Sequence, residues 1–297
     1  MTQLIIYILA AGMLLFSSFF LQENDHPFEN REVFNLGNNV NTTYYEGFPM
    51  IMGDGLTLYF SSDRPGGSGG LDIYYTQRTS AGDSWSKPVN LKSINSPASD
   101  HSVTVSPDGL TMYFMSKREG GFGSGDIYVS SRKDVTDPDG WGSPENVGPV
   151  INTEKLEACP LIHISGNRTE LYFVSNRDDI GGQGEIDIFH TILGSNHKSF
   201  KKPVNMSEIN SPVLDMHFEP LQGLMWSDRK GGVGGQDIWI ADFSTVHNEW
   251  RNPTPLTYPI NTIHEEGMPS ITDDLEELIF HSNRPGGEGS FDIYTAK

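Results

Sequence analysis

Short apolar and aromatic segments alternate with turns and glycine-rich segments along most of the chain. In one of them, residues 102–106 alternate between polar and apolar side chains, as a half-buried strand does. A Pro-Asp-Gly turn at 107–109 follows, and residues 110–116 form a second run rich in apolar and aromatic side chains. After the glycine-rich segment 118–125, a third apolar run begins at Asp126. The pattern predicts three short antiparallel strands in succession.

A fourth strand is indicated by an aromatic residue with a proline three positions later. This pair occurs four times, at Trp85 and Pro88, Trp141 and Pro144, Phe200 and Pro203, and Trp250 and Pro253. Proline cannot donate a hydrogen bond to a neighbouring strand, so it is tolerated on the edge of a sheet. The fourth strand is therefore expected to be the outer edge of each unit.

The whole unit recurs five times. Each copy carries an arginine after the second strand, at Arg64, Arg118, Arg177, Arg229 and Arg284. Each third strand begins with aspartate and isoleucine, at Asp72, Asp126, Asp187, Asp237 and Asp292. The arginines are 52 to 59 residues apart, which suits one four-stranded propeller blade and is too long for a leucine-rich or helical repeat. The sequence predicts an all-β protein, a five-bladed β-propeller of four-stranded antiparallel blades.

The fifth copy lacks its outer strand, because the chain ends at Lys297 directly after the third. Residues 34–36 precede Asn41 much as residues 89–91 precede Asn95. We therefore expect this N-terminal strand to complete the last blade and close the ring, which removes unpaired sheet edges. Residues 30–297 are predicted to form a single propeller, with residues 22–29 as a linker.

An uncharged apolar run covers residues 4–21, so residues 1–21 are predicted to be a signal peptide or an uncleaved membrane anchor. Either reading implies export, to the periplasm or the extracellular space. Acidic residues outnumber lysine and arginine by 39 to 20, for a net charge of −19. Such a charge repels nucleic acids. The expected partner is a protein or a glycan, with membrane contact only through the N-terminal segment.

The motifs resemble a known repeat family. The S-x-D-G turn, the Y-F-S-S-D-R-P-G-G-x-G-x-x-D-I-Y segment and the W-x-x-P-V-N-L segment are similar to the WD-like propeller repeats of the TolB type. The resemblance covers residues 30–297 and implies a propeller in an exported bacterial protein, with diverse roles. The third repeat is longer than the others and the fourth is shorter, which marks these two blades as places where a site could have been built.

Charged residues are predicted to gather on one rim of the propeller. Each repeat has an asparagine followed five residues later by an acid, at Glu46, Asp100, Glu157, Asp215 and Glu266. The acids begin the innermost strands, on the same rim as the five arginines, so an acid–arginine pair is expected in every blade. The pairs would pin the glycine-rich loops through charge-assisted hydrogen bonds, or they would form a charged mouth for an anionic or sugar-like ligand.

Four histidines, His101, His217, His264 and His281, break the fivefold regularity on this rim. Three of them, His101, His217 and His264, would supply ligands for one transition metal together with Asp100, Asp215 or Glu266. The alternative is ordinary polar rim histidines, and on that basis we expect no metal and no cofactor. Calcium held in one glycine-rich loop is a further alternative.

The sequence shows no complete catalytic constellation. The G-x-S-x-G match at residues 66–70 lies between strands, whereas a nucleophile elbow requires a strand-to-helix turn. The preferred hypothesis is an exported, non-catalytic binding or scaffold propeller that recognises a protein or an envelope or extracellular glycan at the channel mouth. The alternative is a carbohydrate-active enzyme, a glycosidase or a metal-dependent lyase, with its site at the same mouth. Sugar binding would be favoured by the rim aromatics Tyr44, Tyr45, Phe122 and Trp226.

Overall fold

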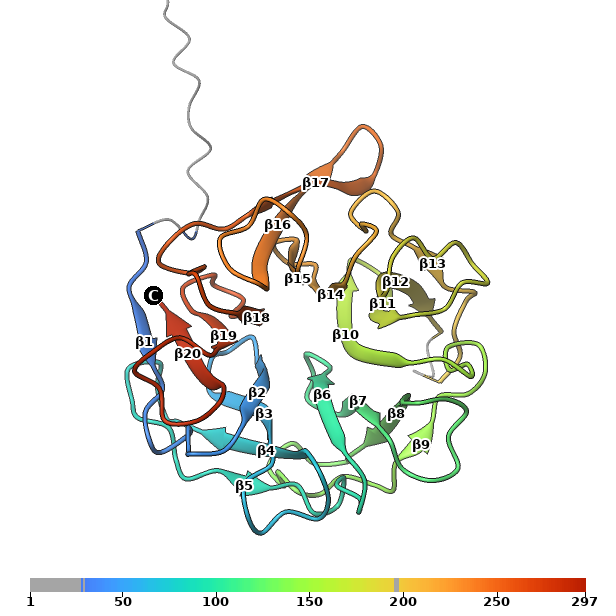
Figure 1. The fold of residues 1–297 in the computed structure, drawn as a ribbon. Helices are drawn as coiled ribbons and strands as arrows, with labels where there is room; N and C mark the ends of the chain where they lie inside the picture. Colours follow the sequence, from blue (N-terminus) through green and yellow to red (C-terminus); the bar gives the residue numbers. More distant parts are fainter. Residues whose placement is uncertain (1–27, 29, 195–197) are drawn as a thin grey trace, which may run out of the picture.

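Five four-stranded antiparallel sheets surround a central axis in the computed structural model, which describes residues 28, 30–194 and 198–297 (Figure 1). Every regular element of this part of the chain is a strand. The predicted five-bladed β-propeller is confirmed. The segments predicted as signal peptide or anchor and as linker lie outside the described residues, apart from Phe28. No helix in the described part has the length and hydropathy to cross a membrane.

The blades follow one another along the chain. Blade one contains β2 (Glu46–Ile51), β3 (Thr57–Ser62), β4 (Asp72–Gln77) and β5 (Val89–Asn90). Blade two contains β6 (Asp100–Val105), β7 (Thr111–Ser116), β8 (Asp126–Ser131) and β9 (Glu145–Asn146). Blade three contains β10 (Glu157–Ser165), β11 (Arg168–Ser175), β12 (Asp187–Leu193) and β13 (Val204–Asn205). Blade four contains β14 (Asp215–Glu219), β15 (Leu224–Ser227), β16 (Asp237–Ser244) and β17 (Glu249–Pro255). Blade five contains β18 (Glu266–Ile271), β19 (Leu278–Ser282), β20 (Asp292–Ala296) and β1 (Val33–Asn35).

The first strand of the chain closes the ring, as predicted. β1 pairs antiparallel with β20, with Phe34 opposite Thr295, and lies beside it at the outer edge of blade five (Figure 1). The other outer strands follow the expected prolines. β5, β9 and β13 begin directly after theirs, whereas Pro253 lies within β17 where its pairing with β16 shifts register. Proline is tolerated at such a bulge because no ladder hydrogen bond is lost.

An asparagine joins each blade to the next. Asn95 receives a hydrogen bond from the Ile73 amide and donates one to the Ile73 carbonyl, both at 2.8 Å, and so fastens the start of blade two to the third strand of blade one. Asn41 makes the same two bonds to Ile293 across the closure. Between the blades, apolar clusters such as that of Ile73, Leu91 and Phe114 are fully buried.

Each innermost strand contains a bulge at its third residue. These residues adopt the left-handed conformation, with φ between 46° and 55°, at Phe48, Ser102, Cys159, His217 and Met268. Each inner strand also shifts register at this point. The sulfur atoms of Cys159 and Met268 are 4.0 Å apart although their blades are not neighbours, so they meet near the axis. Both side chains are buried, and the axis is therefore filled at this level.

Candidate functional site

The predicted acid–arginine pair forms in all five blades. Distances between the paired oxygen and nitrogen are 3.0 Å for Glu46–Arg64, 2.8 Å for Asp100–Arg118, 3.0 Å for Glu157–Arg177 and 3.3 Å for Glu266–Arg284, and Asp215 pairs with Arg229. The acid side chains are 0% exposed, whereas those of the arginines are 4–18% exposed. The pairs lie inside the blades and only the arginine edges reach solvent.

Blade two shows how fully each pair is engaged. Arg118 donates to Asp100 and to the Ile94 carbonyl, at 2.8 Å each, and through Nε to Ser116 Oγ at 2.7 Å. The second oxygen of Asp100 accepts from the amide and hydroxyl of Ser96. These bonds tie the β5–β6 connection to the β7–β8 connection, which favours the interpretation that the pairs pin the loops. A ligand-binding role for the ten residues stays a prediction.

Replacing Arg118 with alanine is expected to lower the free energy of unfolding by about 1–3 kcal/mol, because Asp100 is left buried without its ionic partner. Ligand binding should persist, since four equivalent pairs remain. Urea denaturation measures the loss, with the exposed Lys133→Ala as the control expected to change little. Loss of ligand binding at full stability would instead make Arg118 a ligand contact.

The three candidate metal ligands are not brought together. His217 lies on β14 with Nε2 2.8 Å from the Pro269 carbonyl, whereas His101 stacks on Phe48 with ring centroids 4.6 Å apart. His264 lies in the partly exposed connection before β18. In the described ranges, no group of three or more His, Cys, Asp and Glu side chains is arranged to hold a metal ion. The carboxylates of Asp100, Asp215 and Glu266 are ion-paired with Arg118, Arg229 and Arg284.

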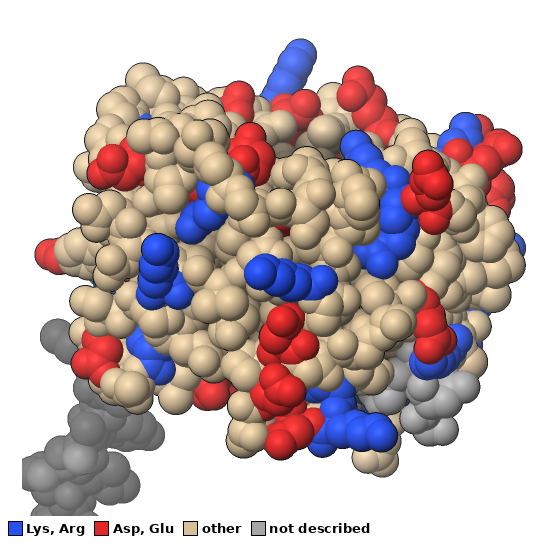
Figure 2. Space-filling model, turned by 90° about the horizontal axis from the view of Figure 1, so that it is seen from below, with Lys and Arg blue, Asp and Glu red and all other residues tan. Residues whose placement is uncertain are grey.

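The rim aromatics differ in exposure. Tyr44 and Phe122 are about half exposed, Tyr45 is partly buried and Trp226 is buried. Acidic and basic side chains are interspersed over the face of the molecule in Figure 2. Tyr44 and Phe122 are therefore the accessible rim aromatics for a sugar or protein, whereas Trp226 is not accessible.

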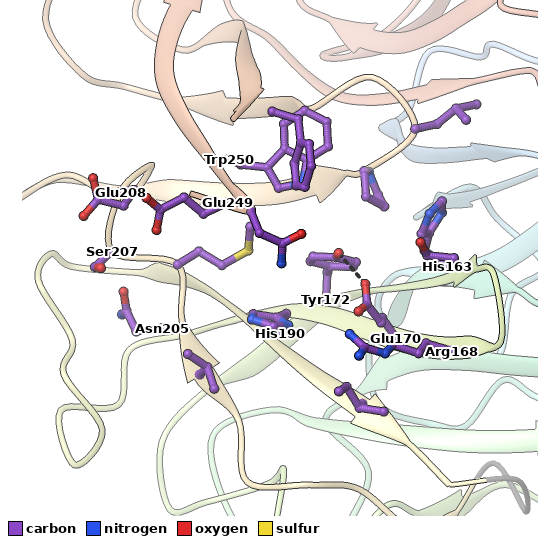
Figure 3. A pocket seen from close by; sticks show the side chains of 18 residues that line it. His163, Arg168, Glu170, Tyr172, His190, Asn205, Ser207, Glu208, Glu249 and Trp250 are labelled. Carbon is purple, nitrogen blue, oxygen red and sulfur yellow. Dashed lines mark hydrogen bonds between the residues drawn. The ribbon is translucent and has the colours of Figure 1, made fainter. Parts of the chain in front are cut away.

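A cavity of about 680 Å³ lies away from the axis, between blades three and four (Figure 3). These are the two blades whose repeat lengths depart from the others. Its walls come from β10–β13, from the turn between β14 and β15, and from the β16–β17 hairpin. None of the lining residues was among the site residues chosen from the sequence. The departures in length were the only signal for this place.

Aromatic and polar side chains face one another across this cavity. Trp250 lies on one side and Tyr172 and His190 on the other (Figure 3). Tyr172 stacks on His190, with centroids 5.9 Å apart, and its hydroxyl donates to Glu170 at 2.8 Å. Trp250 is held edge-on to Phe243 at 5.2 Å. The site thus combines fixed aromatic rings with carboxylate, imidazole and amide groups.

One buried nitrogen in the cavity has no protein partner. His190 Nδ1 makes no hydrogen bond, and burial lowers the pKa of this imidazole, which favours its neutral form. A buried polar atom without a partner costs free energy unless a bound molecule or water satisfies it. His190 can therefore offer a hydrogen bond to a ligand.

The turn that closes one end of the cavity is held by a buried carboxylate. Glu219 accepts the backbone N–H groups of Leu221 at 3.0 Å and Gln222 at 3.1 Å. Burial raises the pKa of Glu219 to about 7, and the nearby Asp273 adds to this. The position of Leu221 in the cavity wall thus depends on a group that titrates near neutral pH.

Comparisons with known proteins identify similar folds. No protein-family model and no curated protein matches the chain. Among solved structures, the α-L-arabinofuranosidase from Lactobacillus brevis matches with a TM-score of 0.56 at 12% identity, over 88% of this chain and 91% of that one. The endo-arabinase from Bacteroides thetaiotaomicron matches with 0.55 at 14% identity, over 86% and 95%. TolB from Acinetobacter baumannii, whose repeat type the motifs resemble, matches with 0.49 at 14% identity, over 90% and 55%. At these identities the matches show the fold alone.

Proposed function

We propose that this protein is an exported glycan-binding propeller whose binding site is the cavity between blades three and four. The observation that carries the proposal is the pairing of Trp250 on one wall with the stacked Tyr172 and His190 on the other. Sugars present apolar ring faces and many hydroxyl groups. Fixed aromatic rings beside convergent hydrogen-bonding groups are the surface that suits them.

The dimensions and chemistry of the cavity support the same class of ligand. Its volume lies in the usual range for binding sites of small molecules, about 300–1,000 Å³. Glu170, Asn205 and Asn248 add polar groups to the lining. The fold neighbours named as arabinofuranosidase and arabinase act on glycans, which makes oligosaccharides the first ligands to test. Export is proposed on the apolar run at residues 4–21.

A glycosidase acting in this cavity is the second candidate. Three carboxylates, Glu170, Glu208 and Glu249, line it, and most glycosidases use a pair of such groups about 5–9.5 Å apart. However, Glu208 and Glu249 both contact Arg251, at 3.2 Å and 3.6 Å. These ion pairs engage two of the three carboxylates, and Glu170 accepts a hydrogen bond from the Tyr172 hydroxyl. We therefore place binding ahead of catalysis.

Trp250→Ala is expected to weaken glycan binding at least tenfold, because one aromatic wall of the cavity is lost. A glycan array identifies ligands, and calorimetry with arabino-, xylo- and cello-oligosaccharides measures the affinity. The matched control is Phe122→Ala, which removes an exposed aromatic from a glycine-rich loop of the rim. If Trp250→Ala lowers the melting temperature too far for binding to be measured, Tyr172→Phe, which removes only a hydroxyl group, is the substitute variant.

Each outcome distinguishes one hypothesis from another. Loss of binding with Phe122→Ala alone would place the site on the rim, as the sequence analysis proposed. Absence of binding to every glycan would reject the proposed function in favour of a protein partner. Release of reducing ends from a bound oligosaccharide, abolished by Glu170→Gln, would establish the glycosidase.

A further inference from the structure

Three of the five residues at the axial bulges are of types that bind soft metal ions. All five innermost strands place their third residue in the same left-handed conformation, but the side chains differ from blade to blade. Three of the five are Cys159, His217 and Met268, and all three are buried. Because all five blades share this conformation, it belongs to the repeat, and the side chain at the bulge is what distinguishes one blade from another.

The two sulfur atoms are separated by a distance suited to a shared metal. Cys159 Sγ lies 4.0 Å from Met268 Sδ. Two ligands that each lie about 2.3 Å from one ion, at about 120° to each other, are about 4.0 Å apart. The geometry is that of two corners of a trigonal site.

His217 has the hydrogen bond of a metal-ligating histidine. Its Nε2 lies 2.8 Å from the Pro269 carbonyl oxygen, which can only accept, so Nε2 carries the proton. Nδ1 then keeps a free lone pair, and this buried atom has no hydrogen-bond partner. Burial also lowers the pKa of His217 to about 4, so the ring is neutral at pH 7. Histidine ligands commonly donate their second ring nitrogen to a backbone carbonyl in this way.

We propose that Cys159 Sγ, Met268 Sδ and His217 Nδ1 bind one Cu(I) ion on the propeller axis. Thiolate and thioether ligands select Cu(I), and imidazole also suits copper. One thiolate and one monovalent cation form a neutral unit, which an apolar interior accepts far better than a divalent ion. The surroundings are mostly apolar, because Phe218, Met225 and Trp226 belong to the same buried cluster, and the Ser102 hydroxyl lies 3.7 Å from the Cys159 sulfur.

Binding requires one proton to leave. Burial raises the pKa of the Cys159 thiol to about 12, so the free site holds S–H. That bond breaks as the sulfur–copper bond forms, the proton passes to solvent and copper stays monovalent. Because binding releases this one proton, the apparent affinity should increase as the pH is raised. This site is separate from the glycan cavity, and neither proposal depends on the other.

The test titrates the purified full chain with Cu(I) under anaerobic conditions, with bicinchoninate as the competing ligand. We expect one Cu(I) per chain, a higher melting temperature with copper, and the stated pH dependence. Cys159→Ser should abolish binding and Met268→Leu should weaken it at least tenfold. Met225→Leu, a buried methionine of the same cluster, should leave it unchanged.

Three results would overturn the proposal. These are the absence of competition with bicinchoninate, binding that survives Cys159→Ser, and equal losses with Met268→Leu and Met225→Leu. If Cys159→Ser does not fold, the comparison of the two methionine variants decides alone.

Discussion

Deletion of residues 28–36 is expected to lower the free energy of unfolding by several kcal/mol, the largest effect predicted for this protein. The deletion removes β1, which pairs with β20. It also removes the Arg31 bonds to the carbonyls of Leu275, Glu276 and Ala296. Phe28, only 2% exposed in the core between blades four and five, is lost as well. Both an edge strand and buried apolar area disappear.

Point variants separate the two contributions. Phe28→Ala should cost about 3–5 kcal/mol through the cavity it leaves, whereas Phe34→Ala should cost little because that ring is 47% exposed. Chemical denaturation measures both variants and the deletion. An unchanged unfolding midpoint for the deleted chain would show that the ring does not need this strand.

The second large effect concerns Glu219 and pH. Its folded-state pKa is about 7, above the ordinary value of 4.5, because burial disfavours the charged form. The stability that this raised pKa contributes is therefore fully present below about pH 4.5 and is lost as the pH rises through 7. At about 1.4 kcal/mol for each pKa unit, the loss amounts to about 3 kcal/mol. Ionisation of this group should therefore make the wild-type protein less stable at pH 8 than at pH 5.

Glu219→Gln isolates this contribution, since glutamine does not titrate. The unfolding free energy of the variant minus that of the wild type should increase by about 2.5 kcal/mol between pH 5 and pH 8. Taking the difference cancels the buried histidines, His217 and His281 among them, whose pKa values are lowered by burial. Parallel stability curves for the two proteins would refute the prediction.

Much of the fold could be predicted from the sequence because the same strand and turn motifs recur in every blade. The aspartates equivalent to Asp126 begin the third strands, and prolines such as Pro144 mark the outer strands. Counting the two sets shows that one outer strand is missing at the C-terminal end, which predicts both the strand order and the closure of the ring. The acid–arginine pairs followed from the same regularity. Their burial did not, because a charged pair beside a loop has the same sequence pattern whether it faces solvent or the blade interior.

The irregular repeat lengths marked the two blades that form the cavity, but the residues that line it could not be predicted. Trp250 has the same motif position as Trp85 and Trp141, which are buried within their blades. Only the longer β16–β17 hairpin carries Trp250 into the cavity wall. The left-handed bulges could not be predicted either, because cysteine, histidine and methionine are not residue types that indicate a positive φ, yet Cys159, His217 and Met268 all adopt one.

The closure described for β1 sets blade five apart from the other four. Blades one to four each use one contiguous segment, whereas blade five joins β18–β20 to β1 from the other end of the propeller sequence, and the Asn41 clamp to Ile293 fastens across the same joint. Blade five is therefore the one sheet of the described residues that cannot be completed by a single segment. During synthesis its fourth strand is made first and waits for its three partners, so the ring can close only after the last of them has been added.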